Sequence, residues 1–236
     1  MPMIGLGQYL NSTSIWQVSA TDAFTMQSNV YQYYINGSTT INSNVYHNIY
    51  MQGFNTDLMT SSTTPISAGP YYLREDGLQW YLHNQTTGTD DLLCDFSLTV
   101  GDDISSFTAS YFLMPEPVVT SITNVTLFGS SVRQKFQLDN GFSFIEGVGN
   151  LAGLFAGYAQ AIESGSNLDC YIQDNIYWVN GPNSICNQII TSIPELNTNK
   201  KTVKITDFLG RETYNLNQPL IYFYNDGTVE KKLIVE

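Results

Sequence analysis

Apolar and polar residues alternate in short runs along most of the chain. Val45–Met51 is typical, because Tyr46, Asn48 and Tyr50 share one face of an extended segment and the residues between them share the other. Clusters of Gly, Asn, Asp, Ser and Pro separate such runs, which are rich in the strand-favouring residues Tyr, Phe, Val and Thr. The pattern predicts an all-β protein, an antiparallel β-sandwich or a barrel-like meander, followed by a short C-terminal β module.

Turn-forming residues locate the boundaries between the expected strands. Asp76-Gly77 and Gly129–Ser131 each predict a hairpin between two flanking strands. Asn36-Gly37 predicts a tight turn, and Gly69-Pro70 predicts a break in the chain. Residues 151–162, rich in Ala, Leu and Gly, fit either a helix or a loop packed over the end of the sheet structure.

Charge divides the chain into two unequal parts. The net charge is −12 with nine Lys and Arg in total, and most of these bases lie after residue 199. The late bases are Lys200, Lys201, Lys204, Arg211, Lys231 and Lys232. This change predicts a domain of residues 1–190 and a separate module of residues 191–236. The acidic body argues against a nucleic-acid partner and against anionic membranes, and no apolar run approaches the roughly 20 residues of a transmembrane segment.

The basic module predicts three short strands. Val203 and Ile205 alternate with polar neighbours, Gly210 suits a turn, and Asn225–Gly227 suits a hairpin turn. On this pattern alone, the segment could equally be a small β-hairpin unit that completes the main sheet.

Four motifs follow one another in this module. They are Val203-Lys204-Ile205-Thr206-Asp207, Leu209-Gly210-Arg211-Glu212, Leu220-Ile221-Tyr222-Phe223-Tyr224 and Asp226-Gly227-Thr228, before a basic and apolar last strand. In this order they resemble the type A C-terminal sorting domain of the type IX secretion system of Bacteroidota. The resemblance implies a secreted or cell-surface protein whose partner is the type IX secretion machinery. It assigns the sorting signal to Lys204, Asp207, Gly210, Arg211, Tyr222, Gly227, Lys231 and Lys232.

Three further motifs lie in the body. They are Tyr71–Gly77, Leu93–Asp102 and Phe144–Gly149. Together they resemble the uncharacterised N-terminal regions of type IX cargo proteins, which implies one domain of about 190 residues and no particular chemistry. Residues 1–8 lack the basic and apolar regions of a signal peptide, so we expect an export signal outside this chain.

The three cysteines suggest one disulfide. Cys170 and Cys186 flank an expected hairpin and a turn, so a bond between them would staple two strands and a loop in an oxidising compartment. Cys94 lies in an apolar run and is expected to be buried as a small hydrophobic residue. The remaining His and Cys show no metal-ligand spacing.

Acidic residues are the candidates for chemistry. Glu75, Asp95 and Glu146 could supply the acid and the base or nucleophile of a glycan hydrolase, although turn formation and pairing with Arg74 or Arg133 explain such acids better. The pairs Asp90-Asp91 and Asp102-Asp103 leave calcium open, without a recognised ligand spacing.

Aromatic and amide residues point to a binding protein. Trp16, Trp80, Trp178 and many Tyr could stack on sugar rings, although aromatics at alternating strand positions more often belong to a core. We therefore expect a secreted or cell-surface protein, non-catalytic and without a resident cofactor, that binds a glycan or surface polymer. The alternative is a carboxylate-dependent glycan hydrolase.

Overall fold

The computed structural model describes residues 9–107, 116–158, 164–181, 184, 186, 202–207, 211, 213, 220–224 and 229–232. The chain forms two compact units, Met1–Ile190 and Thr191–Glu236. Strands form all of the regular structure that the described residues contain, and neighbouring strands are antiparallel.

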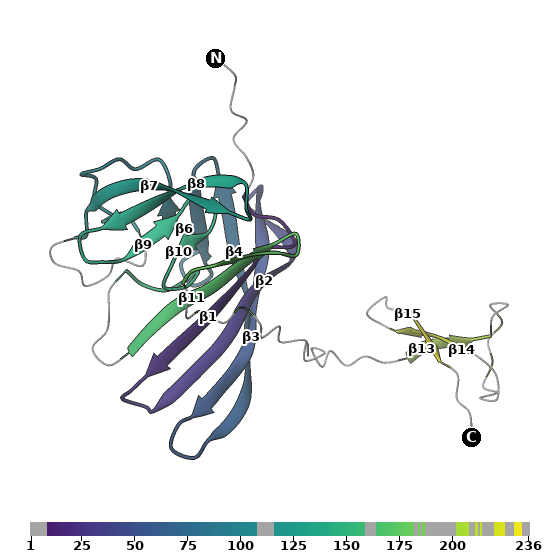
Figure 1. Cartoon of the computed structure of the whole chain (residues 1–236). Coiled ribbons are helices and arrows are strands. Elements are labelled where there is room, and N and C mark those ends of the chain that lie inside the picture. Colours follow the sequence, from purple (N-terminus) through teal and green to yellow (C-terminus); the bar gives the residue numbers. More distant parts are fainter. Residues whose placement is uncertain are drawn as a thin grey trace. The chain divides into compact units, whose positions relative to one another are not determined.

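The larger sheet of the first unit has eight strands in the order β12-β11-β1-β2-β3-β4-β5-β6 (Figure 1). Its strands are β1 (Ile15–Asp22), β2 (Gln27–Ile41), β3 (Asn44–Asp57), β4 (Ser62–Asp76), β5 (Gln79–Asn84), β6 (Thr89–Asp95), β11 (Ser164–Gln173) and β12 (Ile176–Val179). Because β12 and β6 end the sheet without pairing to each other, the described residues form an open sheet and no closed barrel.

A smaller sheet of four strands, in the order β10-β9-β8-β7, packs on part of the larger one (Figure 1). Its strands are β7 (Val119–Leu127), β8 (Ser131–Leu138), β9 (Ser143–Ile145) and β10 (Gly149–Asn150). Trp16 and Trp80 of the larger sheet share one buried core with Phe136 and Phe144 of the smaller sheet. The structure confirms the all-β antiparallel prediction, with two sheets that enclose a core.

The turn-forming residues predicted the positions of two hairpins correctly. Gly77 lies in the turn between β4 and β5, which pair with Arg74 opposite Tyr81. Gly129 lies between β7 and β8, which pair from Val119 to Leu127.

Two positions where the sequence predicted that a strand ends lie inside strands instead. Asn36-Gly37 lies inside β2 and Gly69-Pro70 lies inside β4, each at a bulge where the pairing with β3 changes register. The φ angles of Gly37 and Gly69 are +80° and +110°, a conformation that glycine adopts in bulges as readily as in turns. The chain turns instead at Asn42 and Ser43, where φ is 49° and 70°.

The segment that follows β10 is a loop and not a helix. Residues 151–158 form turns and bends, and residues 159–162 lie outside the described residues. Gly153, with φ of +133°, is incompatible with a helix, and a Cβ there would lie 3.3 Å from a methyl group of Val18. Leu154 and Tyr158 of this loop are buried in the core, so packing rather than helical periodicity fixes it.

Strands β2, β3 and β4 have 15, 14 and 15 residues and extend past the smaller sheet (Figure 1). The larger sheet therefore has a sandwiched half and an overhanging half. One face of the overhang continues the core-facing side of the sheet, and we call it the inner face.

The second unit contains a sheet of three strands, β13 (Thr202–Thr206), β14 (Leu220–Tyr224) and β15 (Val229–Lys232), with β14 in the centre. Thr206, Asp207 and Leu220 are buried. This short sheet is the expected C-terminal β module.

Candidate functional site

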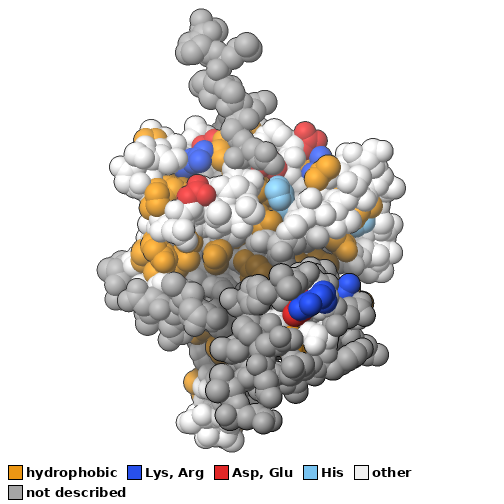
Figure 2. Space-filling view, turned by 90° about the vertical axis from the view of Figure 1, so that its right-hand side faces the viewer, with side chains coloured by type: hydrophobic (Ala, Val, Ile, Leu, Met, Phe, Trp, Pro, Cys, Tyr) orange, Lys and Arg blue, Asp and Glu red, His pale blue; other side chains and the backbone are white. Residues whose placement is uncertain are grey.

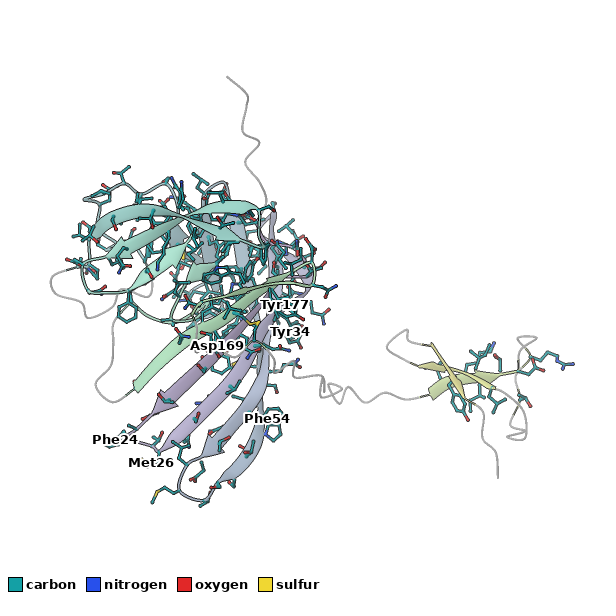
Figure 3. All side chains as sticks on the ribbon, viewed as in Figure 1. Phe24, Met26, Tyr34, Phe54, Asp169 and Tyr177 are labelled. Carbon is teal, nitrogen blue, oxygen red and sulfur yellow. A yellow bond between two sulfur atoms is a disulfide. The ribbon has the colours of Figure 1, made fainter. Side chains whose placement is uncertain are left out.

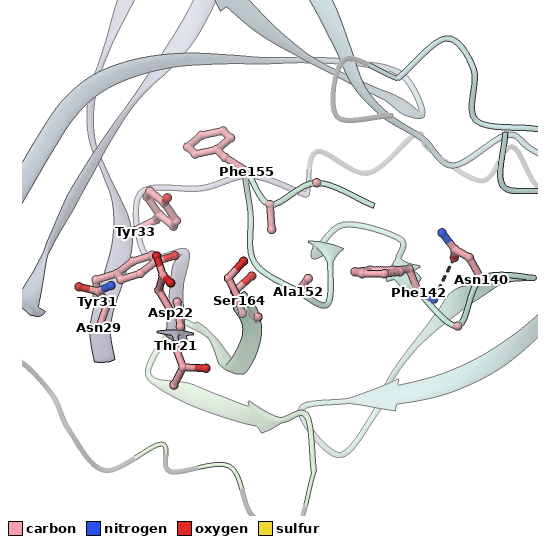
Figure 4. A pocket seen from close by; sticks show the side chains of 16 residues that line it. Thr21, Asp22, Asn29, Tyr31, Tyr33, Asn140, Phe142, Ala152, Phe155 and Ser164 are labelled. Atoms are coloured by element: carbon pink, nitrogen blue, oxygen red, sulfur yellow. Dashed lines mark hydrogen bonds between the residues drawn. The ribbon is translucent and has the colours of Figure 1, made fainter. Parts of the chain in front are cut away.

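A cleft of about 600 Å³ opens where the overhang begins (Figure 4). Its floor and one wall come from β1, β2 and β11, and the other walls come from the β8–β9 turn and the loop after β10. The lining residues are Ala20, Thr21, Asp22, Asn29, Tyr31, Tyr33, Asn140, Gly141, Phe142, Ala152, Phe155, Ala156, Gly157, Ser164, Gly165 and Ser166. This volume is in the range of small-molecule sites, about 300–1,000 Å³.

Aromatic rings form the wall on the β2 side. The ring centroids of Tyr31 and Tyr33 lie 5.5 Å apart, and Phe155 packs edge-on against Tyr33 at 5.0 Å. Tyr71 lies 5.1 Å from Phe155 and supports it from behind. Burial raises the pKa of both Tyr31 and Tyr33, so their hydroxyls stay protonated and neutral at physiological pH.

A glycine on β3 sets the position of Tyr31. Gly53 pairs with Tyr31 across the strands. A Cβ at position 53 would lie only 2.4 Å from the Tyr31 Cβ. The missing side chain thus leaves the space that Tyr31 occupies beside β3.

Neutral polar groups complete the lining. Ser164 pairs with Asp22 and Ser166 with Ala20 across β11 and β1, so both serines lie on the inner face. Asn140 donates through Nδ2 to the Tyr158 carbonyl at 2.8 Å and accepts from the Phe142 N–H at 3.1 Å, which holds the far wall in place. Figure 4 shows Asp22, Tyr31 and Tyr33 on one side of the cleft, opposite Phe142 and Asn140.

Asp22 carries the negative charge of the cleft. Hydrogen bonds from Thr25 and Phe24 lower its pKa, so the carboxylate is ionised at neutral pH. Among the described residues that line the cleft, none is Lys, Arg or His. The site therefore suits a ligand with hydroxyl groups and an apolar ring face, and it disfavours an anion.

Two of the three candidate catalytic acids hold the N-terminal segment in place. Glu75 accepts hydrogen bonds from the backbone N–H groups of Tyr9, at 3.0 Å to both oxygens, and of Leu10, at 3.2 Å. Glu146 accepts from the Tyr9 hydroxyl and from the Gln134 N–H at 3.1 Å. Burial raises the pKa of Tyr9 to about 12, and the bond to Glu146 adds to this shift. Both glutamates are occupied by protein donors, and neither lines the cleft.

The third acid, Asp95, also binds protein donors. It accepts from Gln79 Nε2 at 2.6 Å and from the N–H and hydroxyl of Ser97 at 2.8 and 2.6 Å. The arginines do not pair with Glu146 as the sequence suggested. Arg74 pairs with Asp76 and Asp90, and the guanidinium of Arg133 lies 4.5 Å from the centre of the Tyr9 ring.

The acids considered for calcium bind protein donors as well. Asp90 accepts from Tyr46, Arg74 and His83, and Asp91 accepts from Asn84. Asp102 and Asp103 bind the backbone of their own turns, at the N–H groups of Thr99 and Ser105. Within the described ranges, no three His, Cys, Asp or Glu side chains come together as metal ligands.

The cysteines and tryptophans have structural positions. Cys170 and Cys186 form a disulfide, and Cys94 is free and buried. Trp16 and Trp80 have no exposed surface, so these two rings belong to the core and cannot stack on a ligand. Sequence reasoning instead missed Tyr31, Phe142 and Phe155 as the aromatics of a cleft.

Two residues of the expected sorting signal, Asp207 and Arg211, are joined by hydrogen bonds. Asp207 accepts from the Arg211 N–H at 3.0 Å and from its Nε at 2.8 Å, and the Asp207 N–H donates to the Arg211 carbonyl at 2.9 Å. Lys204 lies on β13, Tyr222 on β14, and the backbone of Lys231 and Lys232 on β15. Gly210 and Gly227 lie outside the described residues.

Comparisons with protein-family models, curated protein sequences and solved structures found no match to this chain. In the part of the chain that the structure describes, no helix has the length and apolar character to cross a membrane.

Proposed function

We propose that this chain is a non-catalytic, exported protein that binds a neutral glycan in the cleft between β1, β2 and the loop after β10. The arrangement that supports the proposal is the aromatic wall of Tyr31, Tyr33 and Phe155 facing serine and amide groups across a cleft of about 600 Å³. Sugar rings present an apolar face to aromatic rings and hydroxyls to amides and carboxylates.

The charge pattern favours a neutral ligand over an anionic one. The chain has a net charge of −12, and Asp22 adds a negative charge inside the cleft. On the face that Figure 2 shows, few of the described side chains are charged, and they are scattered among polar and apolar ones. An uncharged polysaccharide avoids the electrostatic penalty that an acidic one would meet.

The test is affinity electrophoresis of the full chain through gels that contain individual neutral polysaccharides. Phe142→Ala and Asn29→Ala remove one group from each side of the cleft, and we expect each to weaken binding about tenfold. Phe54→Ala and Asn44→Ala are the matched controls, because neither residue lines the cleft. Retardation by no neutral polysaccharide, or equal losses in the controls, would refute the glycan proposal.

Export by the type IX system is supported by the order of the C-terminal motifs and by the hydrogen bonds that join Asp207 to Arg211, two residues of those motifs. Placed behind a signal peptide, the full chain should reach the medium or cell surface of a type IX-competent bacterium and stay periplasmic in its translocon-deficient mutant. Asp207→Asn should reduce export several-fold, and the same change at the exposed Asp174 of the first unit, Asp174→Asn, should not. Periplasmic retention in both strains would exclude this route.

A further inference from the structure

The overhanging half of the large sheet ends in two hairpin turns of the same construction. One turn joins Asp22 of β1 to Gln27 of β2, and the other joins Asp57 of β3 to Ser62 of β4. Each aspartate accepts the backbone N–H groups two and three residues later. Met26 and Ser61 occupy the same place in the two turns, with φ of 54° and 56°. We call these two turns the tip pair.

The tip pair is one rigid unit. The Leu58 N–H donates to the Met26 carbonyl at 2.8 Å, which joins the two turns directly. Gln27 pairs with Asp57, and the Asn55 amide donates to the Gln27 side chain at 2.9 Å. The ends of the two hairpins are therefore held together by backbone and side-chain hydrogen bonds.

Four large apolar side chains project from this unit into solvent. Phe24 is 84% exposed, Met59 79%, Leu58 50% and Met26 42%. Figure 3 shows Phe24 and Met26 at the far end of the β1–β2 hairpin, away from the smaller sheet. A cluster of this kind on a polar surface marks a contact site.

The backbone of the tips is suited to leaving water. Asp22 satisfies the N–H groups of Phe24 and Thr25 at 2.9 and 3.1 Å, and Asp57 satisfies those of Met59 and Thr60 at 2.8 and 2.9 Å. An apolar medium penalises backbone donors that lack a partner, so these four N–H groups add little cost when the neighbouring apolar side chains leave water.

Shape and size favour a lipid surface over a protein or a sugar. The four apolar side chains of the tips project into solvent, and four side chains cannot supply the roughly 800 Å² per partner of a stable protein interface. Their apolar groups are aliphatic, thioether and phenyl, without the polar edge of Trp or Tyr that contacts with sugars commonly use. A projection of this composition fits a deformable apolar medium.

Charge selects the kind of lipid. Arg74 is the first Lys or Arg of the sequence, so the two hairpin turns carry Asp22 and Asp57 without a Lys or Arg of their own. Backbone hydrogen bonds from Thr25 and Thr60 lower the pKa of these carboxylates, and both stay ionised at neutral pH. An anionic bilayer would repel them, whereas the choline groups of a zwitterionic bilayer would not.

We propose that the tip pair inserts Phe24, Met26, Leu58 and Met59 into the surface of a zwitterionic lipid bilayer. This contact is separate from the glycan proposal and stands or falls independently of it.

The test is co-sedimentation of the full chain with phosphatidylcholine vesicles. The double variant Phe24→Ser, Met59→Ser should lower the partition coefficient about a hundredfold, given the apolar area that the two side chains transfer from water. The matched control is Val100→Ser, Val132→Ser, because both valines are 60% exposed and lie outside the tips. Vesicles that contain phosphatidylglycerol should bind the wild-type chain more weakly.

A Phe24→Trp variant gives a second readout. Its added fluorescence should be quenched by brominated phosphatidylcholine, whereas the emission of the wild-type tryptophans should not change. Failure of the wild-type chain to bind phosphatidylcholine overturns the proposal. Equal vesicle binding by the wild type and the serine double variant overturns it as well. So does a double variant whose oligomeric state changes while its vesicle binding does not.

Discussion

The backbone N–H of Tyr9 donates to both carboxylate oxygens of Glu75, at 3.0 Å each. The same carboxylate receives the N–H of Leu10. Burial raises the pKa of Glu75, so its charge costs free energy that these bonds partly offset. The glutamate of the Arg-Glu-Asp-Gly motif is therefore an anchor for the segment that precedes β1.

Glu75→Ala should lower the free energy of unfolding by about 2 kcal/mol, because two part-buried amides lose their acceptor. Urea unfolding at pH 7 measures the loss. The adjacent Asp76→Asn is the control: its side chain is 67% exposed and pairs with Arg74 at the surface, so we expect less than about 0.5 kcal/mol. Equal losses of unfolding free energy in the two variants would contradict the anchoring role of Glu75.

Gly147→Ala should destabilise the chain more than Gly77→Ala. Both glycines have positive φ, 72° and 62°, so both substitutions pay the conformational cost of about 1 kcal/mol. A Cβ at position 147 would also lie 2.7 Å from Cδ1 of Tyr9, whereas nothing lies within 4 Å at position 77. The expected difference is about 1–2 kcal/mol in urea unfolding. A difference near zero would mean that Tyr9 moves away at no cost.

Asp90→Asn should destabilise the body by about 2 kcal/mol at neutral pH, because Asp90 accepts from Tyr46, Arg74 and His83 together. Burial alone would raise the pKa of Asp90, but these hydrogen bonds outweigh it and lower the pKa below 3.8. The ionised form is thus favoured by folding.

The contribution of the Asp90 charge is therefore complete above pH 3.8 and is lost as pH falls through the lowered pKa. The difference in unfolding free energy between the wild type and Asp90→Asn should narrow as the pH falls below about pH 4. Asp91→Asn, next to it in sequence, should cost less, because Asp91 accepts a hydrogen bond from the neutral amide of Asn84 and forms no charged pair of the kind that joins Asp90 to Arg74. A difference that fails to narrow below about pH 4 would contradict the assignment.

Thiol labelling should separate the three cysteines. Cys94 is completely buried, and burial raises the pKa of its thiol to about 12, so the native chain should not react at pH 8. Unfolding without a reductant should expose Cys94 alone, and unfolding with a reductant should add Cys170 and Cys186. Mass spectrometry counts the adducts, and a native adduct or three adducts without reductant would disprove the pairing.

Local features of the sequence were sufficient for fold class and for several hairpins. Gly77 and Gly129 lie in turns as expected, because a turn depends on the conformation of a few adjacent residues. Whether Gly37 lies in a turn or in a bulge could not be predicted from its neighbours in the sequence. It depends on the register of β2 against β3, which long-range pairing fixes.

The cleft was beyond sequence reasoning for the same physical reason. Asp22, Tyr31, Phe142 and Ser164 come from four segments that pattern and spacing cannot bring together. The tip pair was within reach, since Thr-Asp-x-x-Thr occurs at residues 21–25 and again at 56–60. The sequence by itself determined that the chain forms antiparallel strands and that its body is acidic, but not that β2, β3 and β4 continue through their bulges to 14 or 15 residues. Only the tertiary structure decided that Glu75 and Glu146 anchor Tyr9, that Trp16 and Trp80 are buried, and that the aromatic wall lies at a cleft, because side-chain burial depends on which strands become neighbours.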